Sequence, residues 1–293
     1  MQTLMLTMLF IFVDDFCKVF EPHWNQILLE SKAENSRNRK TVLSLSEMLT
    51  ILLFFHMGQF KNFKSYYKFL EEYHKKEFPN LISYNRFVEL KSSCAIPLFV
   101  FFQILSAQCD GESFIDSTHL PVCHNKRELS HKTFKGLAKK SKSTMGWFFG
   151  FKLHMIVNKY GHPISFDITL ATTDDRKAPD NIFQKIFGKL YGDKGYIGKP
   201  FFERMKEKTI QIITAIRKDM KPQIMTQEDS IKLGKRSIIE STFNVLKNIL
   251  NMQHTRHRSP KNFAINIVSS ICAFCLRFVT DLFSFNYNKL LIS

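Results

Sequence analysis

The chain is poor in acidic residues: 26 Asp and Glu stand against 42 Lys and Arg, a formal net charge of +16. A protein this basic suits a polyanionic partner, and nucleic acid is the leading candidate. The alternative is a genomic bias toward Lys, Asn, Ile and Phe, which the 30 phenylalanines suggest. Such a bias explains Lys in place of Arg, but not so large an excess of positive charge.

The sequence also lacks a disulfide framework. Its six cysteines have no regular spacing and lie in apolar surroundings, which favours free thiols in a reducing compartment. Cys272 and Cys275 have CxxC spacing, but no second pair or histidine cluster accompanies them. We therefore expect them to pack in the core and not to bind zinc or perform redox chemistry.

A basic leader, a long apolar span, internal repeats and low-complexity segments are missing too. Residues 1–13 are apolar but run into Asp14 and Asp15, as at a helix start. The apolar run 265–278 is interrupted by polar residues and is too short to cross a bilayer. These features predict a soluble cytoplasmic protein without a membrane partner.

Residues 1–108 are predicted to form a helical N-terminal domain. Ser44 and Glu47 have capping-box spacing before an apolar run, and Ser83 is placed to cap a short helix. Several short helices with basic faces are compatible with a helix-turn-helix that binds DNA ends. A plain helical dimerisation bundle fits equally well.

From residue 112 onward the pattern changes to strands that alternate with helices. A mixed sheet flanked by helices is therefore expected, in an α/β domain that spans residues 109–293 and includes the C-terminal helices. The expected strands are residues 112–123, 147–157, 164–171, a short run ending at Asp193, and 210–216; the expected helices are residues 177–187, 200–208 and the segment around Glu240.

Three carboxylates stand out within these elements. Asp116 lies in an apolar strand, where an ionised carboxylate is unfavourable unless a cation or hydrogen-bond donors compensate it. Asp193 ends a short strand, and Glu240 lies on an amphipathic helix where Arg236, Glu240 and Lys247 share one stripe. Three converging carboxylates can hold two divalent metal ions, and such a pair promotes phosphodiester cleavage.

Each carboxylate also has a simpler explanation. Glu240 and Arg236 could form an ordinary surface ion pair, and Asp193 could be a turn residue before Gly195. Asp174 and Asp175 are interpreted as caps of the next helix, and His119 and His154 as buried neutral side chains. The order strand, strand, helix favours the metal site for Asp116, Asp193 and Glu240 taken together.

A strongly basic segment, residues 125–142, separates the first two strands. It is predicted to be a loop that holds DNA phosphates beside the metal site, although a solvated linker is the alternative. Its seven cations, against one Glu, are Lys126, Arg127, Lys132, Lys135, Lys139, Lys140 and Lys142.

Residues 112–278 resemble the DDE transposases of bacterial insertion sequences, whose catalytic core has the RNase H-like fold. Residues 115–117 resemble the first-Asp strand of that family, and residues 191–197 resemble its second-Asp segment. Arg236, Glu240 and Lys247 match the spacing of the last three members of the Y-R-E-K signature, whose Tyr position is Leu233 here. Residues 172–178 also resemble a segment frequent in this group.

The resemblance implies a transposase in which Asp116, Asp193 and Glu240 are catalytic and hold two Mg²⁺ ions, for which Mn²⁺ can substitute. It implies double-stranded DNA as partner, namely the terminal inverted repeats and the target, with Arg236 and Lys247 on flanking phosphates. Synapsis of two ends implies a homodimer, and the helical domain would bind DNA ends, dimerise or both. The alternatives are a stand-alone RNase H-like nuclease and a non-catalytic DNA-binding protein from a decayed element, which Leu233 would favour.

Overall fold

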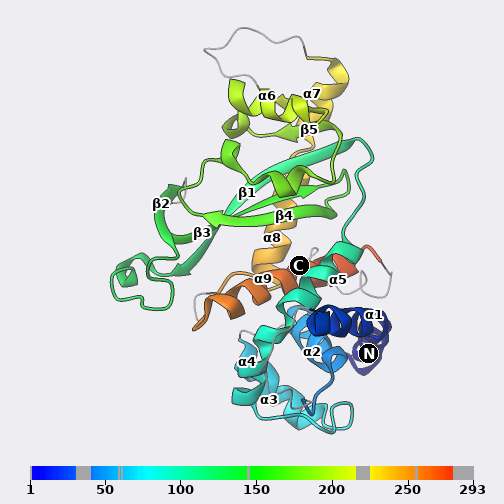
Figure 1. The fold of residues 1–293 in the computed structure, drawn as a ribbon. Coiled ribbons are helices and arrows are strands. Elements are labelled where there is room, and N and C mark those ends of the chain that lie inside the picture. Colours follow the sequence, from blue (N-terminus) through cyan, green and yellow to red (C-terminus); the bar gives the residue numbers. More distant parts are fainter. Residues whose placement is uncertain are drawn as a thin grey trace. The chain divides into compact units, whose positions relative to one another are not determined.

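The computed structural model describes residues 2–30, 41–58, 60, 62–143, 146–215, 225–254 and 257–279. The described residues fall into two compact units (Figure 1). The helical unit draws on Met1–Leu105, Ile249–Met252 and Lys261–Ser293, and the sheet unit on Ser106–Asn248 and Gln253–Pro260.

The helical unit contains α1 (Gln2–Glu30), α2 (Leu45–Met57), α3 (Phe63–Tyr73), α4 (Tyr84–Leu90), α5 (Ala95–Leu105) and α9 (Pro260–Leu276). Helix α2 is buried along nearly its whole length. Its N-terminus has the predicted capping box, in which Ser44 and Glu47 each accept from the other's backbone N–H. Ser83 caps α4 as expected. The helical character predicted for residues 1–108 is therefore confirmed.

Helix α9 belongs to the helical unit, whereas the sequence placed it with the strands. Its link to α2 runs through His56, whose Nδ1 lies 2.6 Å from the Leu250 carbonyl oxygen and whose Nε2 lies 2.9 Å from Ser269 Oγ. Nearly all of α9 is buried. An apolar helix gives no sequence sign of which partner will cover it, so this long-range pairing lay beyond local patterns.

The continuous helical stretch Tyr84–Leu105 is long and apolar enough to cross a membrane by length and composition alone. Core helices of water-soluble proteins share these properties, so the stretch is weak evidence for a membrane span.

The sheet unit is built on six strands in the order β2-β3-β1-β5-β6, with β4 also paired to β3. The strands are β1 (Glu112–Cys123), β2 (Lys139–Ser143), β3 (Gly146–Val157), β4 (Pro163–Leu170), β5 (Gly188–Gly192) and β6 (Ile210–Thr214). Strand β3 is antiparallel to β1, β2 and β4, and pairs with β2 along its first part and with β4 along its second. Strands β1, β5 and β6 are parallel. This mixed sheet has the arrangement expected of an RNase H-like core.

The two faces of the sheet have different covers. One face carries the main core cluster, in which Ile115, Ile156 and Leu190 pack against Phe201 and Met205 of α6 (Lys199–Glu207). Successive strand residues point to opposite faces, so Phe114 and Asp116 of β1 lie on the other face. Helix α8 (Ser237–Asn244) lies across that second face (Figure 1). It follows a short helix, α7 (Gln227–Gly234).

Three local predictions need correction. Residues 177–187 form no α-helix but two short 3-10 turns, Asp175–Lys177 and Asp180–Phe183. Ala178 between them is extended (ψ 138°) because the residue before a proline avoids the helical region. The basic segment is no plain loop, since it ends in β2. The helix of Glu240 stops at Asn244 and continues as a π-helical turn, Val245–Ile249. Ile216, the expected end of β6, lies outside the described residues.

Candidate active site

Pairing of the parallel strands brings Asp116 and Asp193 together. The last residue pair between β1 and β5 is Phe114 with Tyr191, whose rings stack with centroids 5.3 Å apart. Asp116 and Asp193 each lie two residues further along, so both follow this pair on the same face of the sheet. Because β5 ends at Gly192, Asp193 lies where the chain leaves the sheet, and its side chain is exposed.

Glu240 on α8 completes the group, and Arg236 lies between the three carboxylates. Its guanidinium nitrogens are 3.0 Å from Glu240 Oε1, 3.5 Å from Asp116 Oδ2 and 3.9 Å from Asp193 Oδ1. Three carboxylates from three separate elements thus share one cation. The surface i,i+4 pair considered for Arg236 and Glu240 is present, but it is only one part of this cluster.

Asp116 is the least exposed of the three carboxylates, with 22% of its side chain accessible against 54% for Asp193 and 55% for Glu240. Burial raises the pKa of Asp116 to about 6, and the neighbouring charges of Asp175 and Asp193 act in the same direction. A hydrogen bond from the Ser117 N–H and the Arg236 guanidinium oppose the increase in pKa. A cation bound beside Asp116 would stabilise the charged form of its carboxyl group.

The chemistry of these side chains fits divalent metal ions. Carboxylate oxygens are the ligands that Mg²⁺ prefers, and three carboxylates with one guanidinium carry a formal charge of −3 + 1 = −2. Within the described residues, no three His, Cys, Asp or Glu side chains are grouped closely enough to hold a metal ion as they stand. Arg236 lies between the carboxylates.

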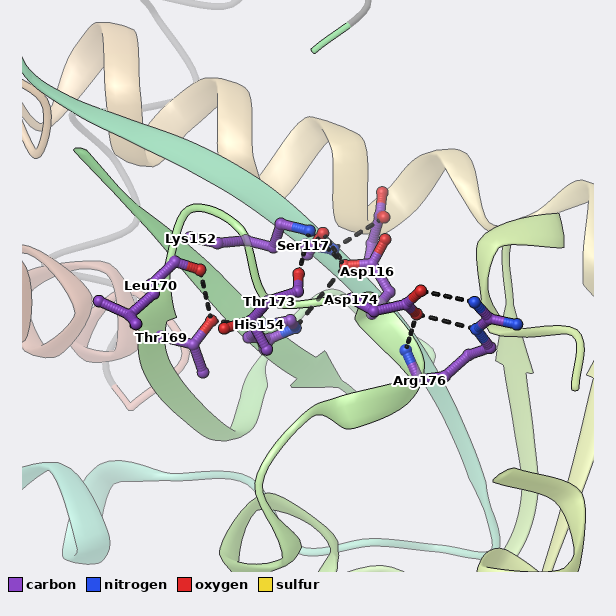
Figure 2. A network of polar contacts seen from close by, with 10 residues as sticks. Asp116, Ser117, Lys152, His154, Thr169, Leu170, Thr173, Asp174 and Arg176 are labelled. Carbon is purple, nitrogen blue, oxygen red and sulfur yellow. Dashed lines mark hydrogen bonds and ion pairs between the residues drawn. The ribbon is translucent and has the colours of Figure 1, made fainter. Parts of the chain in front are cut away.

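A second polar network lies beside Asp116 and centres on a fourth carboxylate, Asp175. Ser117 Oγ donates to Asp175 Oδ1 at 2.6 Å, and Lys152 Nζ donates to the same oxygen at 3.2 Å. Lys152 also donates to the Thr173 carbonyl at 2.7 Å, which ties β3 to the loop after β4 (Figure 2). The expectation that Asp174 and Asp175 both cap a helix therefore holds only for Asp174, which caps the turn Asp175–Lys177 and pairs with Arg176.

His154 borders this network as a buried neutral side chain, as expected. Burial lowers its pKa to about 4, so the imidazole is uncharged near neutral pH. Its Nε2 lies 2.9 Å from Thr169 Oγ1 (Figure 2). Its Nδ1 is 3.9 Å from Asp175 Oδ1, a separation that is not an ion pair when the ring is neutral. His119 is half-buried, and burial lowers its pKa as well.

Tyr196, three residues after Asp193, packs beneath the carboxylates. Its side chain is buried, and its hydroxyl has no hydrogen-bond partner in the described part of the chain. Burial and the charges of Asp175, Asp116 and Asp193 raise the pKa of this phenol, so it stays protonated. The site thus contains a buried donor close to several acceptors.

Lys247 takes a different position from the one its spacing suggested. The spacing placed it on the same α-helical stripe as Arg236 and Glu240, but Lys247 lies within the π-helical turn Val245–Ile249. A π turn adds a residue and so rotates the later side chains about the helix axis. Lys247 is half-buried, and burial lowers its pKa to about 8. Its charge lowers the pKa of His119 on β1, so it remains close to that strand.

The seven cations of residues 125–142 are all exposed, and we call this segment together with β2 the basic arm (residues 125–143). Phe134 and Ala138 anchor it, with 0% and 4% exposure, so the arm is not a solvated linker. Lys140 pairs with Glu128 at 2.8 Å and lies 5.8 Å from the ring centre of Trp147, itself exposed. The other six cations have no ion pair with another described residue in the structure.

The order of the strands, with one carboxylate within β1, one directly after β5 and one on a following helix, is that of an RNase H-like core. A comparison with protein families agrees: residues 106–260 match the transposase DDE domain, which is more than half of the 293 residues. The chain therefore belongs to the transposase DDE domain family. No curated protein and no solved structure matches it.

Membership of this family confirms the resemblance and the fold inferred from the sequence. It implies transposase activity, since the family is one of catalytic nucleases that act on DNA and generally use divalent metals.

Sequence reasoning missed several residues that border the site. Lys152 gave no signal of its own, because an isolated Lys in a strand is common. Ser117 and Tyr196 lay in the segments 115–117 and 191–197 that resemble the family, but no role was assigned to them. Asp175 did lie in a segment with family resemblance, residues 172–178, but it was interpreted as a cap. Its real contacts join positions 117 and 152, which only the sheet brings together.

Proposed function

We infer that this protein is a transposase that cuts DNA at the ends of an insertion sequence and joins the freed 3′ ends to target DNA, with Asp116, Asp193 and Glu240 as its catalytic residues. The observation that carries the inference is the meeting of these three carboxylates, from β1, the end of β5 and α8, around the Arg236 guanidinium. Carboxylates with unrelated surface roles would not be expected to surround one shared guanidinium.

Asp116, Asp193 and Glu240 would hold two Mg²⁺ ions, or Mn²⁺ in their place, through their carboxylate oxygens. When bound, the ions would lower the pKa of the attacking water and neutralise charge on the leaving oxygen. The protein positions this chemistry: β1 and β5 fix Asp116 and Asp193 side by side, and α8 places Glu240 opposite them. Arg236 neutralises part of their charge.

The basic arm and Lys247 would hold DNA phosphates near the carboxylates. Six exposed cations of one segment, without an ion pair to any other described residue, form a surface suited to the phosphate backbone, with little capacity to distinguish bases. Lys247 would act as a point charge, and Arg236 would contact a flanking phosphate once metal ions neutralise the carboxylates. The helical unit would bind DNA ends, support dimerisation or both.

The retention of all three carboxylates supports the catalytic function over a non-catalytic DNA-binding protein from a decayed element. Leu233, at the position of the signature's Tyr, is half-buried near the end of α7 and would remove only one aromatic contact. Synapsis of two element ends would require two copies of the chain. A cytoplasmic location would give the protein access to its DNA.

The decisive experiment is cleavage of DNA that carries the inverted repeats flanking the gene, with purified full-length protein and Mg²⁺. The wild type should nick these ends and form joined products, whereas Asp193→Asn should abolish both because it removes a metal-holding oxygen. DNA affinity should be nearly unchanged, since the basic arm is intact. Gel analysis separates nicked from joined products, and nicking without joining would indicate a stand-alone nuclease.

Asp180→Asn is the matched control. Asp180 is similarly exposed, and its partners are Arg204 at 3.8 Å and Lys208 at 3.4 Å, away from the three carboxylates. This variant should cut DNA as the wild type does. Cleavage by Asp193→Asn at the wild-type rate would refute the assignment of the site.

A further inference from the structure

Ser117 is in contact with two carboxylates at once. Its backbone N–H donates to Asp116 Oδ1 at 2.8 Å, while its hydroxyl donates to Asp175 Oδ1 at 2.6 Å. Asp116 and Ser117 are consecutive strand residues, so their side chains point to opposite faces of the sheet. Asp175 holds the Ser117 side chain on one face of the sheet. It therefore also fixes the backbone from which the Asp116 side chain projects on the other face.

This support acts where β1 has lost a neighbouring strand. The pairing of β1 with β5 ends at Phe114, so within the described residues Asp116 and Ser117 have strand neighbours on the β3 side alone. An unpaired strand edge keeps its backbone groups free and is less constrained than a paired one. A side chain that anchors Ser117 would compensate for the missing neighbour at the position that carries a catalytic carboxylate.

Asp175 is itself held firmly. Lys152 Nζ donates to it at 3.2 Å and to the Thr173 carbonyl at 2.7 Å, which binds β3 and the loop together. The loop is also fixed from α6, because Arg204 donates to the carbonyls of Arg176 and Ala178, each at 3.1 Å. Asp175 is thus a rigid element of the fold and not a mobile surface side chain.

The same carboxylate approaches the segment of Asp193. A Cβ atom at Gly195 would lie 3.3 Å from Asp175 Oδ2, and a Cβ at Gly198 would lie 3.0 Å from the Arg176 side chain. Glycine at these two positions lets the chain after Asp193 pack closely against the loop of Asp175. Asp175 therefore holds the segment of Asp116 through Ser117 and lies close to the segment that supplies Asp193.

We propose that Asp175 is a positioning residue, which acts through Ser117 and the Asp193–Gly195 backbone to keep Asp116 and Asp193 at the separation that metal binding requires. The proposal rests on the proposed metal-dependent function of the three carboxylates. Lys152 neutralises Asp175 and holds it in place. Asp175 also borders an open groove of about 340 Å³ whose lining includes Lys152, Thr173 and Gly195.

The test compares Asp175→Asn with wild type in the full-length protein, by titrating Mn²⁺ with electron paramagnetic resonance and by measuring cleavage against Mg²⁺ concentration. Partners that orient metal ligands typically contribute about 10- to 100-fold to metal affinity, so Asp175→Asn should weaken Mn²⁺ binding and raise the Mg²⁺ requirement by roughly that factor. Cleavage at saturating metal should recover most of the wild-type rate, and the metal-free melting temperature should change little.

Asp174→Asn is the matched control, because it removes the same charge one residue away. Asp174 pairs with Arg176 and caps a turn; within the described residues Lys152 acts on it only through its charge, and it has no hydrogen bond or ion pair with Ser117 or Lys152. Its metal requirement should remain within about twofold of wild type, since a surface charge contributes little. An equal shift in both variants would mean that general charge, not positioning, is responsible, and would overturn the proposal.

Ser117→Ala gives an independent test that leaves all charges in place. It should raise the metal requirement in the same direction, by less than Asp175→Asn. A lower melting temperature with an unchanged metal requirement in both variants would assign Asp175 a purely structural role and overturn the proposal. Asp193→Asn, measured in parallel, distinguishes failure of the proposed function from failure of the positioning role. If the wild type neither binds Mn²⁺ nor cuts DNA, the proposed function itself is refuted. Loss of cleavage in Asp193→Asn with wild-type behaviour of Asp175→Asn refutes only the positioning role.

Discussion

At the scale of single residues, Arg236 connects the three carboxylates of the candidate site. Its guanidinium lies within 3.9 Å of an oxygen of each of Asp116, Asp193 and Glu240. Arginine suits this position because its planar group offers several donors in fixed directions. Without it, three carboxylates would repel one another with no cation between them.

Replacement of Arg236 should therefore make stability depend on metal. Arg236→Met should lower the free energy of unfolding in EDTA by about 1–3 kcal/mol, because it leaves charged partners unsatisfied. Added Mg²⁺ should then raise the melting temperature more in this variant than in wild type, since the ions supply the missing positive charge. Thermal melting with and without Mg²⁺ measures both effects.

Lys232→Met is a suitable comparison for that measurement. Lys232 pairs with Glu112 and Glu228, neither of which belongs to the candidate site, so its loss should also leave two carboxylates without their shared cation. Its melting temperature should respond to Mg²⁺ as the wild type does. If Arg236→Met showed no additional Mg²⁺ response, the role of Arg236 as the shared cation would be wrong.

At the scale of secondary structure, the helix that carries Glu240 changes form at Val245. The α-helical part keeps Arg236 and Glu240 on one face, and the π-helical turn then directs Lys247 into a half-buried position near β1. Isolated π turns inside helices occur frequently at functional sites. The turn thus gives Lys247 an environment that differs from that of the exposed lysines of the basic arm.

This environment predicts a pH dependence of DNA binding. Burial lowers the pKa of Lys247 from 10.5 to about 8, so its positive charge is lost as pH rises through 8 while exposed lysines stay charged. DNA affinity should fall between pH 7 and pH 9 in wild type, and less in Lys247→Gln, which has no charge to lose. Fluorescence anisotropy at constant ionic strength measures this difference.

The contribution of Lys247 to stability changes with pH in the opposite direction to its contribution to DNA affinity. Because the folded pKa of about 8 is below the unfolded value of 10.5, the unfolded chain binds more protons between these limits. The contribution of Lys247 to stability therefore increases with pH in that range. An identical fall of affinity in wild type and Lys247→Gln would exclude Lys247 as a phosphate contact.

At the scale of the whole molecule, positive charge is distributed unevenly. The net charge is +16, and residues 125–142 alone contribute seven cations against one Glu. Strands β2 and β3 present this segment beside the sheet, and the buried Phe134 fixes it to the sheet unit. Such a surface should bind DNA mainly through counterion release, which makes the affinity strongly salt-dependent.

The double variant Lys139→Gln/Lys142→Gln should reduce that salt dependence. Each lysine that neutralises one phosphate contributes roughly 0.9 to the slope of log affinity against log salt, so the slope should fall by up to about 2. The control Lys199→Gln/Lys206→Gln removes two exposed lysines of α6 and should leave the slope unchanged. Equal slopes in both double variants would show that the basic arm has no special role in DNA binding.

The sequence by itself determined the local elements and the identity of the carboxylates. Residues 112–123 were predicted as a strand and form β1, since strand-forming residues with apolar neighbours need no distant information. The family spacing also identified Asp116, Asp193, Arg236 and Glu240, because those residues lie in short motifs. The helix predicted for residues 177–187 was wrong because Pro179 keeps Ala178 out of the helical conformation.

Only the tertiary structure decided which residues meet. The contact of Arg236 with Asp116, and those of Asp175 with Ser117 and Lys152, join positions separated by between 23 and 120 residues. Strand pairing and helix packing set these distances, and no local pattern records them. The position of α9 in the helical unit has the same physical reason. Burial of an apolar helix is favourable against any complementary apolar surface, and the tertiary fold determines which surface lies close enough to cover it.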